Sequence, residues 1–290
     1  MKREIRVKTF GFINVDKSSG AMSSAIVNKI KWLSGVPCGH MGTLDPLASG
    51  VLPVGVGNAT RLFDYFLQKK KEYVAEFTFG QTADTLDSTG EIEVGGHIPT
   101  EEELKAVLPS FIGELDQIPP KYSAKNVNGQ RGYDLARAGV EFELPPKRIE
   151  VFDIELLEKV EGKDNAYNFR IECGGGTYIR SLARDIATAC GTKGLMSGLR
   201  RTQSGIFTLE NAVSIDDLTE ENINDYLIPT EQILPYKTLT LTSPRAEKIF
   251  DGVAICTDEE DGLYKFYRDG EFYGIAEVKD GRAKIKTKLC

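Results

Sequence analysis

One aspartate stands out because its neighbours restrict the backbone around it. Asp45 precedes Pro46, and a proline pushes the residue before it toward an extended conformation. Gly39, Gly42 and Gly50 flank this pair and permit turns that other residues rarely adopt. A carboxylate on such a loop is either a turn-former or a catalytic group. Asp before Pro is ordinary turn chemistry, so the residues alone favour the structural interpretation.

Four other side chains could belong to a functional site, although each has a simpler structural interpretation. Tyr73 lies in a run that alternates apolar and polar residues, which predicts a strand with Tyr73 on its core face. Arg180 follows a glycine-rich turn and begins a helix whose free N–H groups could meet a phosphate, but it could equally be a surface arginine. By spacing alone, Leu199 is a core residue and His40 is a turn residue.

The residues that follow the Asp45 loop suggest one competing function. Gly55 and Gly57 lie between an expected strand and an expected helix, as in a dinucleotide-binding loop. That fingerprint needs Gly or Ala three residues after the second glycine, where this chain has Thr60. We therefore interpret the glycines as a tight strand-to-helix turn.

Several motifs together resemble the TruB family of pseudouridine synthases. The longest is G-H-x-G-T-L-D-P-x-A-x-G-V-L-P-V-x-x-G-x-A-T-R over residues 39–61, with Asp45 in register with the family's catalytic aspartate. Shorter matches are K-x-Y, an acid-rich loop, G-T-Y-I-R-S-L and a fourth motif, at residues 71–73, 80–90, 176–182 and 198–205. The family's K-P-x-G-x-T-S motif is altered, since Ser18 and Met22 replace its Pro and Thr. The resemblance covers roughly residues 10–210.

The resemblance implies that the chain isomerises uridine to pseudouridine, with Asp45, Tyr73 and Arg180 as catalytic residues. The N-glycosidic bond breaks, the base rotates, and a C–C glycosidic bond forms. Nothing is oxidised and no group is carried away, so we expect no cofactor and no metal. The resemblance also implies a set of substrate-binding residues, which are His40, Leu199, Thr43, Lys17, Arg131 and Tyr178.

The implied reaction assigns a task to each main residue. Asp45 must be an ionised carboxylate aimed at the nucleotide, and Arg180 is its natural partner, which only the fold can bring near. The target base must flip out of its stack to be reached. Tyr73 would stack on the flipped uracil and help to move the C5 proton, while Leu199 would wall the pocket. His40 would fill the space that the base leaves or stack against the RNA loop.

Within the family, the length and an inserted thumb resemble the stand-alone members that act on uridine 55 in the T-loop of tRNA. The expected partner is therefore the tRNA T-stem-loop, without guide RNA and without a membrane, and the expected state is a monomer in the cytoplasm. Two alternatives remain open. The chain could be a guide-RNA-dependent rRNA pseudouridine synthase, or a tRNA-binding or tRNA-folding protein.

Charge is unevenly distributed along the chain. The net charge of −7 argues weakly against nucleic acid, but residues 202–236 hold seven acidic and no basic residues and account for all of it. Residues 121–148 contain six basic and three acidic residues, and residues 180–201 contain five basic and one acidic. An acidic chain can therefore still present a basic face to phosphates.

Composition and cysteine usage exclude several classes of protein. Hydrophobic residues make up 41% and charged residues 27%, as in ordinary globular proteins, and no apolar run approaches the length of a membrane span. The five cysteines are scattered and form no C-x-x-C pair, which disfavours a disulfide framework or a zinc site.

The expected fold is α+β, a pseudouridine synthase core with a mixed or antiparallel central sheet flanked by helices. Strands are expected at residues 10–15, 51–54, 73–79, 149–156 and 168–173. Helices are expected from Ser23 or Ser24 to Gly35, and at residues 60–67, 100–112 and 179–186. We expect a catalytic domain at residues 1–232, with the thumb insertion at about 121–148. A small PUA-like β domain of hairpins, turned at four Asp-Gly pairs, is expected at residues 233–290.

Overall fold

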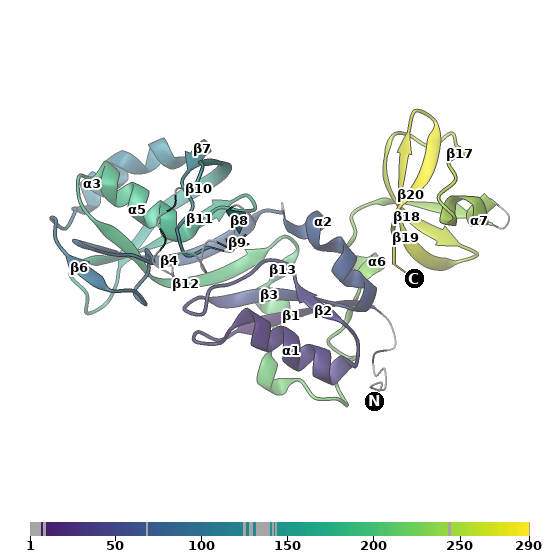
Figure 1. The fold of residues 1–290 in the computed structure, drawn as a ribbon, viewed down its shortest axis with the longest axis horizontal. Helices are drawn as coiled ribbons and strands as arrows, with labels where there is room; N and C mark the ends of the chain where they lie inside the picture. The colour runs from purple at the N-terminus through teal and green to yellow at the C-terminus, as the bar shows by residue number, and fades with distance from the viewer. Residues whose placement is uncertain are drawn as a thin grey trace.

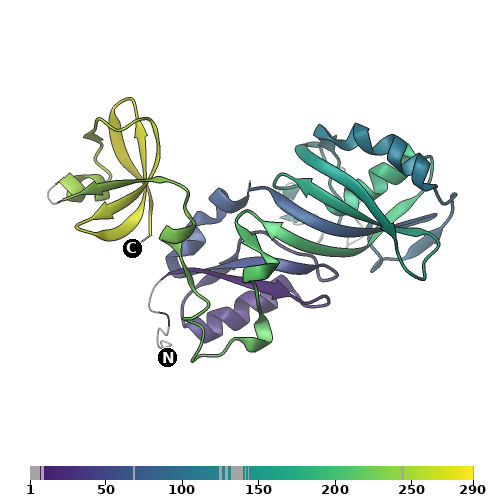
Figure 2. The same cartoon turned by 180° about the vertical axis from the view of Figure 1, so that it is seen from behind.

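The computed structural model describes residues 7, 10–67, 69–123, 126–127, 130–131, 140, 142, 144–242 and 245–289. Most of the predicted thumb lies outside the described residues. A large sheet with its helices forms one body, and a smaller sheet lies at one end of the molecule (Figure 1). The view from behind shows the same separation, with the short helix α6 (Thr230–Ile233) between the two parts (Figure 2).

The large sheet has eleven strands, with the main path β14-β1-β3-β12-β4-β11-β10-β7. Their bounds are β1 Gly11–Lys17, β2 Cys38–His40, β3 Ser49–Val56, β4 Lys71–Phe79, β7 Gly113–Gln117, β10 Lys147–Lys159, β11 Ala166–Cys173, β12 Gly194–Ser204, β13 Phe207–Thr208, β14 Val213–Ser214 and β15 Ile228–Pro229. Most pairs are antiparallel, whereas β1–β14 and β3–β12 are parallel. The predicted α+β class with a mixed sheet is confirmed.

Helices cover the two halves of this sheet. Helix α1 (Ser23–Ser34) packs beside β3, while α5 (Ile179–Ala189) packs on β4 and β12 next to α3 (Glu101–Val107) (Figure 1). The other helical elements in the described ranges are short: α2 Phe63–Leu67, α7 Arg245–Phe250, and the 3-10 turns η1 Gly57–Leu62, η2 Leu108–Phe111, η3 Leu209–Asn211 and η4 Ile215–Asp217. Helices α1, α3 and α5 therefore pack into the main core on one face of the sheet, whereas η1 and α2 contribute Leu62 and Phe66 to a second cluster on the opposite face.

Local signals explain where two of the helices begin and end. Thr100 and Glu103 form the expected capping box of α3, which runs on as the 3-10 turn η2. Helix α1 ends at Gly35 in the left-handed conformation, as predicted. Its predicted serine cap is wrong, because Met22 occupies the cap position and the Ser23 hydroxyl instead bonds to the backbone of Leu44.

Strands β1 and β3 are buried on both faces, which explains their continuous apolar sequences. Ile13 and Leu52 point into the main core, whereas Phe12 and Val51 point into a second cluster on the opposite face. That second cluster includes Ile275 from the small sheet. One face of β1 and β3 thus packs against helix α1, and the opposite face packs against the C-terminal part.

The C-terminal part is a five-stranded sheet in the order β16-β18-β19-β20-β17. Its strands are β16 Lys237–Leu241, β17 Ile255–Cys256, β18 Gly262–Arg268, β19 Glu271–Lys279 and β20 Arg282–Lys288. Asp269 and Asp280 occupy hairpin turns with positive φ, as predicted. The other two Asp-Gly pairs are not hairpins, since Asp251 follows helix α7 and Asp261 immediately precedes β18.

Candidate active site

The loop that carries Asp45 connects β2 to β3, and hydrogen bonds from neighbouring segments hold its backbone in place. The Ser23 hydroxyl donates to the Leu44 carbonyl at 2.7 Å, and the Gly20 amide donates to the Pro46 carbonyl at 2.8 Å. The Lys17 ammonium donates to the carbonyls of Pro46 and Ala48. The loop backbone is therefore fixed by β1 and α1, while the Asp45 side chain is 37% exposed.

Arg180 approaches Asp45 from helix α5. Its Nε lies 2.9 Å from Asp45 Oδ2, and its Nη1 lies 3.6 Å from Asp87 Oδ2. Nη1 also donates to the Thr85 carbonyl at 2.9 Å, and Nη2 donates to the Tyr122 carbonyl at 3.1 Å. Only 7% of Arg180 is exposed. The arginine is therefore held on four sides, and the ion pair limits the orientations of the Asp45 carboxylate.

Asp87 is a functional candidate that the sequence reasoning missed. It is 5% exposed, and its Oδ1 accepts hydrogen bonds from Thr85 Oγ1 and from the amide and hydroxyl of Thr89. These bonds shape a turn, which is a common role for an aspartate in a loop. The same carboxylate, however, also faces Arg180. The match of residues 80–90 to a family motif was the available signal.

Gln117 is a second residue that the sequence reasoning missed. Its side-chain amide donates to the Tyr178 carbonyl at 3.0 Å and accepts from the Tyr178 amide at 2.9 Å. These two hydrogen bonds fix the backbone of Tyr178, the residue that precedes helix α5. From that helix, the Ser181 hydroxyl and Arg184 both donate to the Ile118 carbonyl. The start of α5 and the segment that enters the predicted thumb are therefore joined directly.

Tyr73 lies on β4 with 7% of its surface exposed, as its alternating pattern predicts. Burial raises the pKa of Tyr73 to about 12, while the charge of Arg201 opposes that shift. Asp45 lies close enough to Tyr73 to act on it electrostatically, and it acts in the same way on Tyr178. Asp45, Arg180, Tyr73 and Tyr178 therefore converge on one site.

His40 lies at the end of β2, where it is half-buried. Within the part of the chain that the structure describes, its Nδ1 is buried and has no hydrogen-bond partner. Burial lowers the pKa of His40, and the charge of Arg201 lowers it further. The imidazole is therefore neutral at pH 7 and retains an unused polar atom.

The remaining predicted binding residues differ in exposure. Thr43 is exposed on the Asp45 loop, and Leu199 is half-buried on β12 opposite Ala75 of β4. Lys17 is completely buried, and burial lowers its pKa while the Asp45 carboxylate opposes the shift. The backbone of Arg131 belongs to the short strand β9 (Gln130–Arg131), whose side chains lie outside the described residues.

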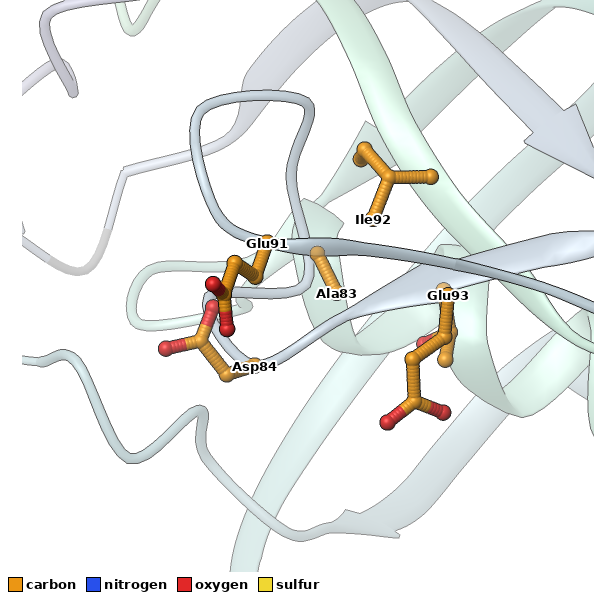
Figure 3. Close-up of a pocket in the computed structure, with 6 residues that line it drawn as sticks. Ala83, Asp84, Glu91, Ile92 and Glu93 are labelled. Carbon is orange, nitrogen blue, oxygen red and sulfur yellow. The ribbon is translucent and has the colours of Figure 1, made fainter.

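A pocket of about 430 Å³ adjoins the loop that supports Arg180. Its lining includes Asp84, Glu91, Ile92 and Glu93 from the hairpin of β5 (Gln81–Ala83) and β6 (Ile92–Val94). Figure 3 shows the carboxylates of Asp84 and Glu91 near each other on one side of the hairpin. Because this lining is acidic, the pocket would repel a phosphate backbone and does not suit RNA.

Among the described side chains, no group of three or more His, Cys, Asp or Glu residues is arranged to hold a metal ion. None of the helices in the described ranges is long and apolar enough to cross a membrane.

Comparison with known proteins identifies relatives over nearly the whole chain. Residues 31–179 match the model of the TruB family pseudouridylate synthase N-terminal domain, and residues 180–235 match the tRNA pseudouridylate synthase B C-terminal domain. A tRNA pseudouridine synthase B from Gluconobacter oxydans is 44% identical, covering 96% of this chain and 90% of its own. One from Saccharophagus degradans is 37% identical, covering 93% of this chain and 92% of its own.

Solved structures give the same picture of the fold. A Cbf5-Nop10-Gar1 complex contains a chain with 27% identity and a TM-score of 0.71, covering 97% of this chain and 85% of that one. An H/ACA RNP bound to a substrate RNA containing 2'-deoxyuridine gives 26% identity and a TM-score of 0.69, with the same coverage.

Proposed function

Since the chain belongs to the TruB family of pseudouridine synthases, we propose that it isomerises uridine to pseudouridine at position 55, in the T-loop of tRNA. The relatives named tRNA pseudouridine synthase B support tRNA as the substrate. The observation that carries the proposal is the ion pair between Asp45 and Arg180, which joins the signature loop to helix α5 at a half-exposed carboxylate. Cytoplasmic residence and a monomeric state, without a guide RNA, complete the proposal.

Asp45 is the group that attacks the nucleotide in this proposal. Its loop is fixed behind the carboxylate by Lys17 and Ser23, and Arg180 fixes the carboxylate itself. Preorganisation of this kind places a reacting group near its target before the reaction begins. Lys17, which we expected among the substrate-binding residues, serves instead to position the Asp45 loop, because its ammonium is buried against carbonyl oxygens.

The flipped uracil would lie beside Asp45, between side chains of strands β4 and β12 and the start of helix α5. Tyr73 and Leu199, from adjacent strands, supply the aromatic and aliphatic surfaces, and Tyr178 approaches from the start of α5. The neutral His40 ring would fill the place that the flipped base leaves in the RNA. Thr43, which is exposed on the Asp45 loop, and Arg131, in the predicted thumb, complete the proposed RNA-binding residues.

The proposed reaction balances without any additional reactant. The C1'–N1 bond breaks, the uracil rotates, and a C1'–C5 bond forms. C5 then loses its hydrogen as a proton, and N1 gains a proton. The residues present therefore need only to attack, to stabilise charge and to move protons.

The fold likeness to the Cbf5 complex and the H/ACA RNP keeps the guide-RNA-dependent alternative in view. The greater identity to relatives named tRNA pseudouridine synthase B favours a stand-alone enzyme. We also propose a domain boundary near residue 233, with a small PUA-like domain after it. The separate sheet that begins at Lys237 supports that division.

The test is tritium release from an unmodified tRNA transcript labelled at C5 of uridine, without guide RNA. Wild-type protein should release tritium, and Asp45→Asn should not. A transcript with cytidine at position 55 is the substrate control, and loss of release from it assigns the position. Release by Asp45→Asn would refute the role of Asp45. Binding of the tRNA without any release by wild type would favour an RNA-binding or RNA-folding protein.

A further inference from the structure

We infer that Gln117 is a positioning residue for the reaction, which sets the start of helix α5 and so places Arg180 against Asp45. This inference rests on the proposed function, because the ion pair of Arg180 needs precise placement only if Asp45 attacks a nucleotide. The supporting observations are the two hydrogen bonds of the Gln117 side chain, its burial, and the weak local signals at the start of α5.

Local sequence does not fix where α5 begins. Tyr178 occupies the cap position in an extended conformation, and within residues 174–190, all of which the structure describes, the helix has no side-chain cap and no acidic residue in its first turn. The hydroxyl of Thr177, which could serve as a cap, instead donates to the Gly174 carbonyl at 3.1 Å. Three consecutive glycines precede Thr177, and such a backbone has wide conformational freedom. The start of the helix must therefore be held from elsewhere in the fold.

The Gln117 side chain supplies that restraint. Its Oε1 accepts from the Tyr178 amide at 2.9 Å, and its Nε2 donates to the Tyr178 carbonyl at 3.0 Å. The carboxamide thus pairs with the donor and the acceptor of one residue, as a neighbouring strand would. The same Tyr178 carbonyl accepts the helical hydrogen bond from the Leu182 amide at 3.1 Å. Gln117 therefore fixes the residue from which the helix propagates.

Gln117 is itself held in the sheet. It is the last residue of β7, it pairs with Lys147 of β10, and it is only 2% exposed. The carbonyl of Ile118, the next residue, accepts two hydrogen bonds from side chains of α5. A few residues later, the Tyr122 carbonyl accepts from Nη2 of Arg180 at 3.1 Å. Gln117 therefore fixes the helix relative to the segment that helps to hold Arg180.

The contacts of Arg180 make it sensitive to the position of the helix. Its guanidinium lies 2.9 Å from Asp45 and 3.6 Å from Asp87, and it donates to two backbone carbonyls. Because a guanidinium is planar and its donors point in fixed directions, a displaced helix start cannot preserve all of these contacts. Loss of the Gln117 restraint would therefore reorient the Asp45 carboxylate through Arg180.

The test is a double-mutant cycle on the single-turnover rate of tritium release from the labelled tRNA transcript. Gln117→Met, which keeps an unbranched side chain of similar length but removes both hydrogen bonds, should lower the rate about 10-fold to 100-fold. The dissociation constant for tRNA should change less than about threefold, because the loss lies in the chemical step. In an Arg180→Lys background, the same substitution should lower the rate less than about threefold further, because the guanidinium is already gone.

Gln203→Met is the matched control, because it makes the same change at another glutamine that donates to a backbone carbonyl. Gln203 is half-buried on β12, and its Nε2 donates to the Gly205 carbonyl at 2.8 Å, within the turn between β12 and β13. Its loss should change the rate less than about threefold. Thermal unfolding of every variant separates a folding defect from a rate defect. If Gln117→Met does not fold, Gln117→Glu, which keeps the acceptor for the Tyr178 amide but loses the donor, takes its place in the cycle.

Three results would overturn the inference. An undiminished rate in the Gln117 variant would remove any role in the reaction. An equal loss in the wild-type and Arg180→Lys backgrounds would make Gln117 a structural residue that acts independently of Arg180. A loss confined to tRNA affinity would assign Gln117 to binding instead. Release by wild-type protein on the same tRNA tests the proposed function, whereas the ratios between variants test the inference, so the two failures are distinguishable.

Discussion

Replacing Asp87 by asparagine removes one of the two carboxylates that face Arg180, while it keeps an oxygen acceptor for Thr85 and Thr89. At the observed 3.6 Å, the attraction between Asp87 and Arg180 is roughly 5 kcal/mol for an effective dielectric constant near 20. Arg180 keeps Asp45 and two backbone carbonyls as partners, so we expect a net destabilisation of about 2 kcal/mol. For a chain of this size, that corresponds to a fall in Tm of about 5 °C.

The same substitution should also slow the reaction. With one side of its guanidinium released, Arg180 holds the Asp45 carboxylate less firmly, and misplacement of a reacting group by about 1 Å costs up to 100-fold in rate. We therefore expect Asp87→Asn to lower the single-turnover rate about 10-fold to 100-fold, with tRNA affinity nearly unchanged.

Asp84→Asn is the matched control, since Asp84 bonds to Tyr122 and no contact with Arg180 is found for it among the described residues. Differential scanning calorimetry and tritium release would be run on wild type and both variants. If Asp87→Asn matched wild type in both Tm and rate, the reasoning that Asp87 restrains Arg180 would be refuted.

Three further outcomes follow from the geometry. Arg180→Lys keeps the charge but loses the fork that spans Asp45 and the backbone carbonyls, so the rate of tritium release should fall at least about 100-fold with little change in tRNA binding; a rate within threefold of wild type would contradict this. Gly50→Ala places a Cβ 2.2 Å from the Arg201 carbonyl and should destabilise the fold by about 3 kcal/mol or more in urea unfolding, whereas Gly20→Ala, with positive φ but open space, should destabilise by about 1 kcal/mol. Burial lowers the pKa of Lys71 from 10.5 to about 8, so the unfolded chain binds more protons between these pH values and the free energy of unfolding rises with pH. From pH 7.5 to 9.5, wild type should therefore gain about 2 kcal/mol of stability relative to Lys71→Met. Parallel plots of unfolding free energy against pH for the two proteins would disprove the pKa shift.

Local elements of the fold could be predicted because their signals are local. The alternation of Tyr73, Ala75, Phe77 and Phe79 gives strand β4, and all four are buried as expected. The Thr100 capping box likewise fixes the start of α3. These patterns depend on residues that are close in sequence, so no knowledge of the tertiary fold is needed to recognise them.

Pairing between distant segments could not be predicted in the same way. Nothing near Gly194 or Ser204 shows that strand β12 lies between β3 and β4, and we expected no strand there. Ser23 looks like a helix cap in sequence, but its hydroxyl is used by Leu44, which is distant in the chain. Local capping rules fail where a tertiary contact competes for the same hydroxyl.

The residues of the candidate site divide in the same way, into those that sequence motifs indicate and those that only the fold reveals. The family resemblance indicated Asp45, Arg180 and Tyr73, and the structure brings these three together, although their roles stay predictions. It did not indicate that Asp87 faces Arg180 or that Gln117 locks Tyr178, because supporting contacts depend on which loops the fold places side by side. The burial of Lys17 could not be inferred from the sequence either, because the carbonyls of Pro46 and Ala48 that contact its ammonium are distant in the chain.

The position of β12 also affects how the protein folds. Arg201 and Val51 are in contact although 150 residues separate them, and Arg200 and Ser49 are separated by 151. Contacts at such separations close late and slow the folding of a chain, because a large loop must be ordered before they form. During synthesis, strand β3, which follows the Asp45 loop, therefore lacks its neighbour β12 on one edge until β12 has been made. The candidate site is therefore complete only after β12 has been made, and an N-terminal fragment that ends before β12 would contain Asp45 and Tyr73 without Leu199.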